Sequence, residues 1–222
     1  MRTNSTVLDP SAKYLDSDAT ALTRTRYQRI APLYDKIESL MEGRFRPWRQ
    51  KLWQSVRGPE VLEVGVGTGK NIEFWPANAE ITAIDLTPGM LAIARQRTMS
   101  LDWEADLRLG DVQSLEFPSA SFDAVVATFV FCSVPDPVQG LREIGRVIRP
   151  GGQILLLEHV RIDRPVIGKM MDALAPIIVR LNGANINRRT IENIRIAGLQ
   201  IEQVEDLDSM GMFKLILARA QD

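Results

Sequence analysis

The chain has 222 residues, of which 45% are hydrophobic and 25% are charged, a composition typical of one globular domain with a full-sized core. Its formal net charge of −1 supplies no basic field for a polyphosphate backbone, so we expect no nucleic-acid substrate. A single cysteine excludes an intramolecular disulfide, and no hydrophobic signal core is visible, so we expect a cytoplasmic monomer or homodimer with at most peripheral membrane contact.

The first part of the sequence predicts an arm followed by a helical cap. Residues 1 to about 20 are polar and aperiodic. Between residues 23 and 53, apolar side chains recur at steps of three and four, which predicts two or three helices. We therefore expect an arm and cap over residues 1–57 and the main body over residues 58–222, together forming one structural unit.

Buried strands and helices alternate through the middle of the chain. This alternation predicts a parallel sheet with helices on both faces. The expected strands cover residues 61–64, 81–85, 107–109, 122–127 and 153–157, and the expected helices cover residues 71–75, a stretch beginning at Pro88, and residues 141–148.

An insertion over residues 164–187 interrupts this alternation. It holds Pro176 within an apolar stretch, so we expect two short helices that meet at the proline. A helix over residues 188–197 and an antiparallel pair of strands, residues 200–204 and 213–218, follow it. The complete pattern predicts a doubly wound α/β fold, with a mostly parallel seven-stranded sheet whose last strand is antiparallel.

The apolar part of the insertion contains methionines and aliphatic residues. It predicts a flexible cover over the mouth of the site, suited to a lipophilic acceptor or a membrane edge, although a dimer face or a core helix would show the same pattern. Its residues are Lys169, Met170, Met171, Leu174, Ile177, Ile178 and Val179.

A glycine loop joins the first predicted strand to its helix, at Gly65, Gly67 and Gly69. Glycines here let the backbone approach a ligand closely and direct free N–H groups toward it. Dinucleotide-binding loops have the spacing G-x-G-x-x-G, but here Lys70 occupies the place of the third glycine. The spacing therefore disfavours a nicotinamide or flavin cofactor.

The wider pattern resembles the nucleoside-binding signature of class I S-adenosylmethionine-dependent methyltransferases. It consists of E-V-G-V-G-T-G from Glu63, an aspartate that ends the second strand, and G-D-V after the third. The resemblance implies S-adenosyl-L-methionine as cofactor, S-adenosyl-L-homocysteine as product, and no metal. It implies cofactor contacts at Tyr34, Glu63, Gly65, Gly67, Thr68, Gly69, Asp85, Leu86, Met90, Asp111, Val112, Thr128 and Phe129.

Within this resemblance, Asp85 accepts hydrogen bonds from both ribose hydroxyls. Asp111 faces the adenine amino group, and the adenine ring lies between Leu86 and Val112. The chemistry agrees, because a vicinal diol donates twice and a carboxylate can accept both bonds. Asp85 could instead cap the helix that begins at Pro88, and Asp111 could be a turn residue.

Longer runs are similar to the branch that holds the quinone C-methyltransferases and bacterial phosphatidylethanolamine N-methyltransferases. These runs cover residues 26–35, 131–137 and 146–160. The words L-L-L-E-H-V-R and N-G-A-N-I-N-R-R-T are also similar to methyltransferase-like proteins that methylate small thiols. An N-x-Y-Y-like segment typical of the quinone enzymes is missing. We therefore expect N-methylation of a phosphatidylethanolamine-type acceptor, with quinone C-methylation, thiol S-methylation or non-catalytic cofactor binding as alternatives.

Two residues are candidates for catalysis. His159, the only histidine, ends the fifth predicted strand, beside the crevice in which open α/β sheets bind ligands. It could act as an acid or base, or be a structural histidine that bonds the insertion. Tyr34 reaches the methionine end of the cofactor in the resemblance, and Thr128 and Phe129 form the floor beneath the methyl group.

Further residues are candidates for acceptor binding. Tyr27 has the same helical spacing as Tyr34, although that spacing is also typical of core packing. Cys132 lacks a paired base, which disfavours a nucleophile. Asn185, Arg188 and Arg189, together with Asn187, lie at the opening of the last helix and could hold an anionic headgroup, or could be a helix cap with solvated arginines.

Overall fold

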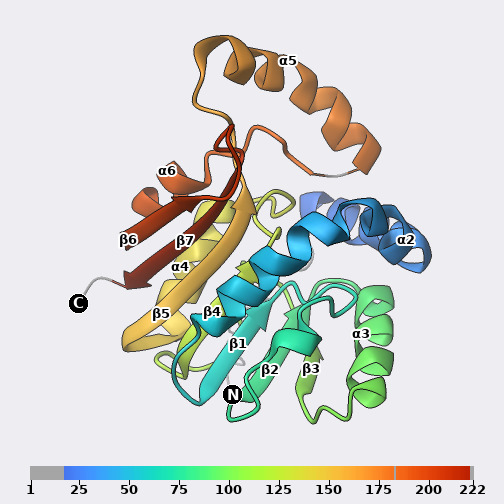
Figure 1. Ribbon diagram of the computed structural model, residues 1–222, viewed down its shortest axis with the longest axis vertical. Helices are drawn as coiled ribbons and strands as arrows, with labels where there is room; N and C mark the ends of the chain where they lie inside the picture. The colour runs from blue at the N-terminus through green and yellow to red at the C-terminus, as the bar shows by residue number, and fades with distance from the viewer. Residues whose placement is uncertain (1–17, 183, 221–222) are drawn as a thin grey trace, which may run out of the picture.

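The computed structural model describes residues 18–182 and 184–220, so most of the expected N-terminal arm, residues 1–17, lies outside the described part. A seven-stranded sheet in the order β3-β2-β1-β4-β5-β7-β6 lies between helices (Figure 1). The strands are β1 (Glu60–Val64), β2 (Glu80–Asp85), β3 (Asp106–Leu109), β4 (Phe122–Thr128), β5 (Ile148–His159), β6 (Leu199–Asp206) and β7 (Phe213–Ala220).

Strands β1 to β5 pair in parallel, and β7 pairs antiparallel with both β5 and β6. The predicted doubly wound fold with its antiparallel last strand is confirmed. The helices are α2 (Asp18–Gln54), the 3-10 helix η1 (Ile72–Phe74), α3 (Pro88–Ser100), α4 (Pro137–Val147), α5 (Pro165–Asn182) and α6 (Thr190–Ile196).

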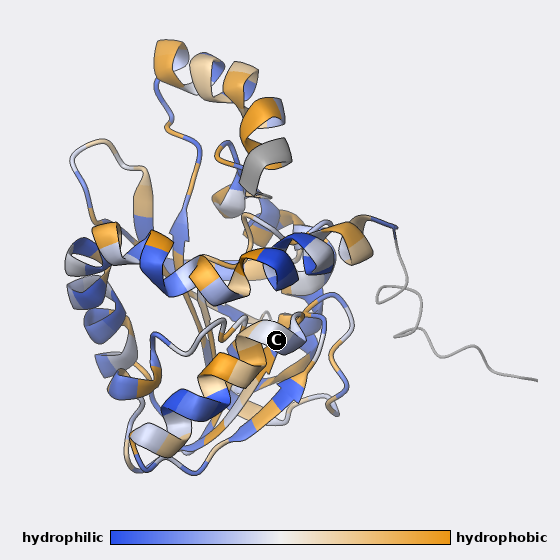
Figure 2. Cartoon of the chain, turned by 90° about the vertical axis from the view of Figure 1, so that its right-hand side faces the viewer, coloured by the Kyte–Doolittle hydropathy of each residue, from blue (hydrophilic) through white to orange (hydrophobic). Residues whose placement is uncertain are grey.

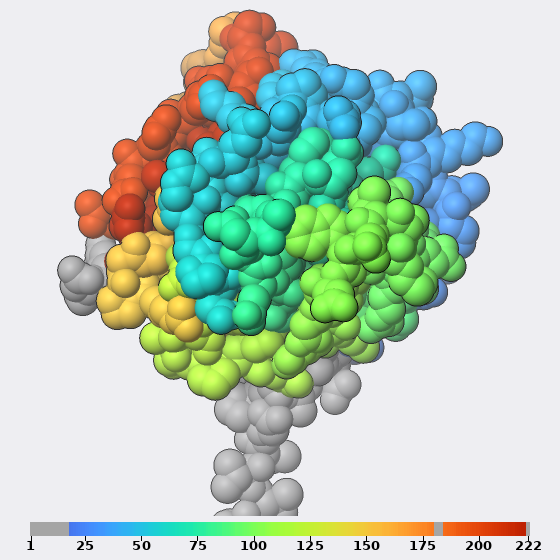
Figure 3. Space-filling model, turned by 60° about the horizontal axis from the view of Figure 1, so that its bottom comes forward, coloured from blue at the N-terminus to red at the C-terminus, as the bar shows by residue number. Residues whose placement is uncertain are grey.

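The core has two halves, one on each face of the sheet, because successive strand side chains point to opposite faces. On β4, Val125 packs with α4 and α6, whereas Val126 packs with the end of α2 and with α3. The carboxyl ends of β1, β2, β3 and β4 consequently meet at one edge. Figure 3 looks at the opposite end of the sheet, where the cyan and green parts of the chain cover much of the face.

The N-terminal cap is one helix of 37 residues, where the sequence predicted two or three. Pro32 and Pro47 lie inside α2, and the helix continues through both of them. A proline removes one backbone hydrogen bond and bends a helix without always ending it. Burial of Leu52 and Trp53 anchors the second half of α2 in the core, and Figure 1 shows the helix changing direction along its length.

The insertion is also one helix, α5, which runs through Pro176 instead of breaking there. Figures 1 and 2 show α5 standing away from the body, with much of its surface coloured as hydrophobic in Figure 2. It has too few tertiary contacts to impose a break at the proline. No helix of the described residues combines the length and apolarity that a membrane span requires.

The other differences concern the ends of elements. Strand β5 begins at Ile148, before the predicted turn at Pro150, and its pairing with β4 shifts register between Phe122 and Ala124. The turn residues therefore form an irregularity within the strand. The helix predicted over residues 188–197 is shorter, Thr190–Ile196, because Arg188 bonds the loop before α4 instead of continuing the helix.

Candidate functional site

The glycine loop folds against the end of β2. Gly65 has φ +69°, and a Cβ placed there would lie 2.5 Å from Cγ2 of Val130, so only glycine fits. Gly67 also has a positive φ, +57°, and its amide donates to Oδ2 of Asp85 at 2.9 Å. The loop thereby brings the ends of β1 and β2 together around one carboxylate.

Asp85 is partly buried and keeps spare hydrogen-bonding capacity. Its Oδ1 accepts the amide of Thr87 at 2.8 Å, so with the bond from Gly67 each oxygen has one protein donor. Burial raises its pKa to about 6, which leaves it ionised near neutral pH. The N-cap residue of α3 is Thr87, so Asp85 is not the cap itself. A carboxylate with free lone pairs that faces a cavity suits the two hydroxyls of a ribose.

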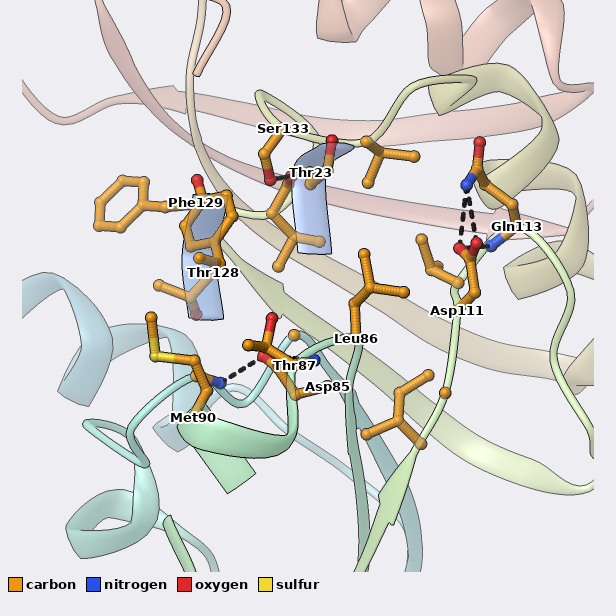
Figure 4. A pocket seen from close by; sticks show the side chains of 18 of the residues that line it. Thr23, Asp85, Leu86, Thr87, Met90, Asp111, Gln113, Thr128, Phe129 and Ser133 are labelled. Carbon is orange, nitrogen blue, oxygen red and sulfur yellow. Dashed lines mark hydrogen bonds between the residues drawn. The ribbon is translucent and has the colours of Figure 1, made fainter. Parts of the chain in front are cut away.

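A cavity of about 750 Å³, counted out to its open mouth, lies above this edge of the sheet. Figure 4 shows the Leu86 side chain between Asp85 and Asp111, with Thr128 and Phe129 on the other side. The candidate residues that line it are Tyr27, Tyr34, Gly65, Gly67, Asp85, Leu86, Met90, Asp111, Val112, Thr128 and Phe129.

Three expected contacts lie behind the cavity wall. Glu63 is fully buried and accepts hydrogen bonds from Asn71 Nδ2 at 2.6 Å and Trp75 Nε1 at 2.7 Å, and burial raises its pKa to about 7. Thr68 donates its hydroxyl to Asp35 at 2.6 Å, which ties the glycine loop to α2. Gly69 packs against Ile72. The structure therefore gives these residues supporting contacts and does not bring them to the cavity surface.

At the end of the cavity expected to hold adenine, Asp111 already has a partner. Both of its carboxylate oxygens accept the side-chain amide of Gln113, at 3.0 and 2.9 Å, and Oδ1 also accepts the Gln113 backbone amide. Leu86 and Val112 line the cavity as expected. Gln113, which the sequence analysis did not identify, also lines the cavity and adds a second polar side chain beside Asp111.

The opposite end is aromatic. Tyr27, Tyr34 and Phe129 line the cavity, and the two tyrosine rings are 6.5 Å apart. The Tyr34 hydroxyl donates to Oε1 of Glu38 at 2.9 Å, and burial raises the pKa of both groups. Phe129, the residue that follows β4, has φ +56°, a strained backbone conformation for a residue with a large side chain. This conformation sets the direction of its ring.

Arg49 links the two walls of this aromatic end. It is 4% exposed, its Nη1 donates to Oδ1 of Asn71 at 3.2 Å, and its guanidinium lies 5.5 Å from the Phe129 ring centre. It also pairs with Glu38 at 3.7 Å, and Asn71 donates onward to the Thr128 hydroxyl. A continuous polar network therefore joins Tyr34 to Thr128 beneath the cavity.

His159 is not among the described residues that line the cavity. Its Nε2 lies 3.2 Å from the carbonyl oxygen of Asn185, and burial lowers its pKa, so the ring is neutral near pH 7. The sequence placed it correctly at the end of β5, but its Nε2 contacts a backbone carbonyl of the linker before α6. This contact fits the structural alternative and does not place His159 beside the acceptor.

Of the other predicted acceptor residues, Tyr27 lines the cavity, whereas Cys132, Asn185, Arg188 and Arg189 lie outside its lining. The Cys132 thiol donates to the carbonyl of Phe129 at 3.3 Å, and burial raises the pKa of the thiol, which makes it inert. Its own carbonyl accepts the Asn185 amide at 2.8 Å. Arg188 and Arg189 line a second cleft, described below.

Several lining residues were missed by the sequence analysis. Ser133, Val134 and Pro135 line the cavity within a run that carried the family resemblance but no assigned role. Thr23 and Thr87 also line it, and no sequence signal distinguished them from ordinary helix residues. Residues 169–179, expected as a cover, contribute nothing to the described lining, because α5 stands away from the body.

Comparison with known proteins identifies the domain. A family model described as "Methyltransferase domain" matches residues 62–156, which contain the glycine loop, Asp85 and Asp111. The chain is 38% identical over 123 residues to a phosphatidylethanolamine N-methyltransferase of Cereibacter sphaeroides, a match that covers 54% of this chain and 61% of that protein. Less than two thirds of that relative is thus represented here.

Longer matches join the chain to quinone enzymes. A demethylmenaquinone methyltransferase of Renibacterium salmoninarum is 31% identical, with 73% of this chain and 68% of that protein covered. A ubiquinone/menaquinone biosynthesis C-methyltransferase of Rhodopseudomonas palustris is 31% identical, with coverage of 70% and 67%.

Solved structures share the fold. A putative methyltransferase of Haloferax volcanii, solved with a methyltransferase activator, is 18% identical with a TM-score of 0.69, and covers 88% of this chain and 98% of its own. The [4+2]-cyclase SpnF is 22% identical with a TM-score of 0.65, covering 78% and 80%. The fold therefore accommodates different chemistries, and the reaction must be argued from the site.

Proposed function

Because the chain belongs to the family of S-adenosylmethionine-dependent methyltransferases, we propose that it transfers a methyl group to the nitrogen of a lipophilic amine of the phosphatidylethanolamine type. The observation that carries this proposal is the aromatic end of the cavity, formed by Tyr27, Tyr34 and Phe129. N-methylation yields a methylated ammonium, which aromatic ring faces attract. The products of C- and S-methylation are neutral and gain less from those rings.

The bound cofactor supplies an electrophilic methyl carbon on a sulfonium, and the amine lone pair displaces the sulfur in line. The residues of this chain hold the reactants in that geometry, which can contribute about 7–11 kcal/mol to lowering the barrier. We assign the ribose to Asp85, the adenine to Leu86 and Val112, and the floor beneath the methyl group to Thr128 and Phe129.

An ammonium acceptor must lose a proton before it attacks. We propose that Tyr34 and Glu38 form the route for that proton, in place of His159. The Tyr34 hydroxyl lines the cavity and already donates to Glu38, whose raised pKa favours proton acceptance. The proton passes from nitrogen to the Tyr34 oxygen as the Tyr34 proton passes to Glu38, so charge is conserved.

The experiment is methyl transfer from labelled cofactor to matched amine, quinone-precursor and thiol acceptors. We expect transfer to the lipophilic amine, a turnover lowered about 10²–10⁴-fold by Tyr34→Phe, and near-normal turnover in His159→Ala. Glu38→Gln should move the acidic limb of the pH–rate profile. Equal turnover in Tyr34→Phe and the wild type would remove the proton route, and transfer only to another acceptor class would reject the amine.

Quinone C-methylation is the second candidate, since the longer matches are to quinone enzymes. A flat aromatic acceptor would stack on the same rings. Transfer to a demethylated quinone, with none to the amine, is the result that would favour it. Cofactor binding without transfer to any acceptor class would instead favour a non-catalytic binding protein.

We further propose that α5 makes peripheral contact with a lipid surface. Four side chains at helical spacing remain exposed on it, Val166, Met170, Leu174 and Ile177, at 79%, 55%, 44% and 58%. Lys169, also exposed, adds positive charge for anionic headgroups. Flotation with anionic vesicles tests this, and an unchanged bound fraction after replacing Met170 and Ile177 with glutamine would reject it.

A further inference from the structure

A second cleft lies between the link from β5 to α5, the start of α6, and the ends of β6 and β7. Its volume is about 830 Å³ out to its open mouth. None of its described lining residues is shared with the cofactor cavity. Five of them are cationic, Arg161, Arg188, Arg189, Arg195 and Lys214, against the two carboxylates of Asp163 and Glu192.

Three of these cations are neutralised by ion pairs. Arg161 pairs with Asp172 at 2.9 Å, Arg189 pairs with Glu192 at 3.4 Å, and Lys214 pairs with Asp206. Within the described ranges, no ion pair forms at Arg188 or at Arg195. Among the described lining residues, Arg195 therefore keeps a positive charge outside any ion pair, while the charge of Arg188 interacts with Glu158 and Asp136 at longer range.

Two buried donors in the cleft also lack partners. Thr190 is completely buried, and its hydroxyl makes no hydrogen bond in the structure. The Nε of Arg188 is likewise buried without a partner, although its Nη2 donates to the carbonyls of Val134 at 2.9 Å and Cys132 at 3.4 Å. An unpaired buried donor is destabilising, so a ligand that accepted hydrogen bonds from these two groups would gain binding energy from them.

We propose that this cleft binds a phosphate group, with the Thr190 hydroxyl and Arg188 Nε as buried donors and Arg195 as the charge at the mouth. A phosphate offers several acceptor oxygens with negative charge, which matches a set of donors and cations. The group could belong to a lipid headgroup or to a soluble phosphate compound. The proposal does not rest on the proposed acceptor, because phosphate binding needs neither cofactor nor turnover.

The sharpest test is Thr190→Val, which removes the unpaired hydroxyl and keeps the shape of the side chain. The hydroxyl has no partner in the protein, so the midpoint of thermal unfolding should not fall, while affinity for the phosphate should fall at least tenfold. Arg195→Gln, on the exposed side of α6, should weaken binding about threefold. The matched control is Arg142→Gln, an exposed arginine on α4 outside the cleft, which should bind like the wild type.

Binding is measured by calorimetry on the full chain, at fixed ionic strength, with two separate probes. The probes are inorganic phosphate and glycerophosphoethanolamine, the headgroup phosphodiester without acyl chains. Thr190-dependent binding of the phosphodiester alone identifies a lipid headgroup, and Thr190-dependent binding of inorganic phosphate identifies a soluble source; either supports the cleft. No binding of either probe to the wild type, or equal affinity in Thr190→Val and the wild type, would overturn the proposal.

Discussion

The cofactor cavity and the cationic cleft are formed by different parts of the chain and in different ways. The cavity is formed where the parallel strands β1 to β4 end, and its polar group Asp85 is held by backbone amides of adjacent loops. The cleft is formed by the link to α5, by α6 and by the antiparallel strands, and its charges are long side chains. The polar group of the cavity is thus positioned by the local backbone, whereas the charged groups of the cleft are positioned by tertiary packing.

This difference explains what each region can tolerate. A site held by backbone geometry is sensitive to any change in loop conformation, whereas a site held by arginines is sensitive mainly to loss of single donors and to salt. Substitutions that act on one region and spare the other therefore test the comparison directly.

The largest effect is expected from Gly65→Ala. The positive φ of Gly65 and the clash with Val130 together should destabilise the fold by about 2–4 kcal/mol. Gly43→Ala provides the matched control, since nothing lies within 4 Å of its added methyl group and alanine favours the helix by about 0.5–1 kcal/mol. Urea unfolding of both variants measures the difference. Equal stability in the two variants would show that the glycine loop is not conformationally constrained.

Asp85→Ala should reduce cofactor affinity by about 1.5–3 kcal/mol, the range for hydrogen bonds to a charged group. Asp106→Ala is its control, because that carboxylate is exposed at the start of β3 and pairs with Arg108 outside the cavity. Calorimetry with S-adenosylhomocysteine distinguishes them. Unchanged affinity in Asp85→Ala would mean that the ribose lies elsewhere, while the cationic cleft would be unaffected.

The smallest effect concerns Glu158 on β5, which lies between the two regions. Its Oε1 accepts the amides of Val130 and Phe131, and burial raises its pKa to about 7. The folded state therefore holds a proton that the unfolded state loses near pH 4.5, so stability falls as pH rises from about 4.5 to 7.

Glu158→Gln should remove this penalty and still accept both amides. We expect it to be more stable than the wild type by about 1–2 kcal/mol at pH 8, with little difference at pH 4. Unfolding at the two pH values provides the measurement. A variant that is less stable at pH 8 would show that the carboxylate charge itself supports the loop.

The parts predicted well from sequence were those whose causes are local. Gly65 and Gly67 predict the loop correctly because the turn needs residues with positive φ. The position of Asp85 was predictable because it ends a buried strand. The division of the N-terminal cap into two or three helices and the break at Pro176 were wrong, because a proline removes only one backbone hydrogen bond and does not always end a helix.

Contacts made by distant segments could not be predicted in the same way. Gln113 lines the end of the cavity expected to hold adenine only because its side chain folds back on Asp111. The Nε2 of His159 contacts the carbonyl of Asn185, which lies 26 residues further along the chain. Ser133 lines the cavity because Gly65 admits the neighbouring loop at close range. Each of these positions depends on packing that composition and spacing do not encode.

Helix α2 gives the molecule one further property. Its last turns bury Leu52 and Trp53 in the core, while its first half supplies Thr23 and Tyr27 to the cavity. Pro32 separates the two halves, and the first half is held by a hydrogen bond from the Gly89 amide to Gln28 at 2.9 Å. The gap that the proline leaves in the backbone hydrogen bonds of α2 therefore falls between the part of the helix that packs in the core and the part that lines the cavity.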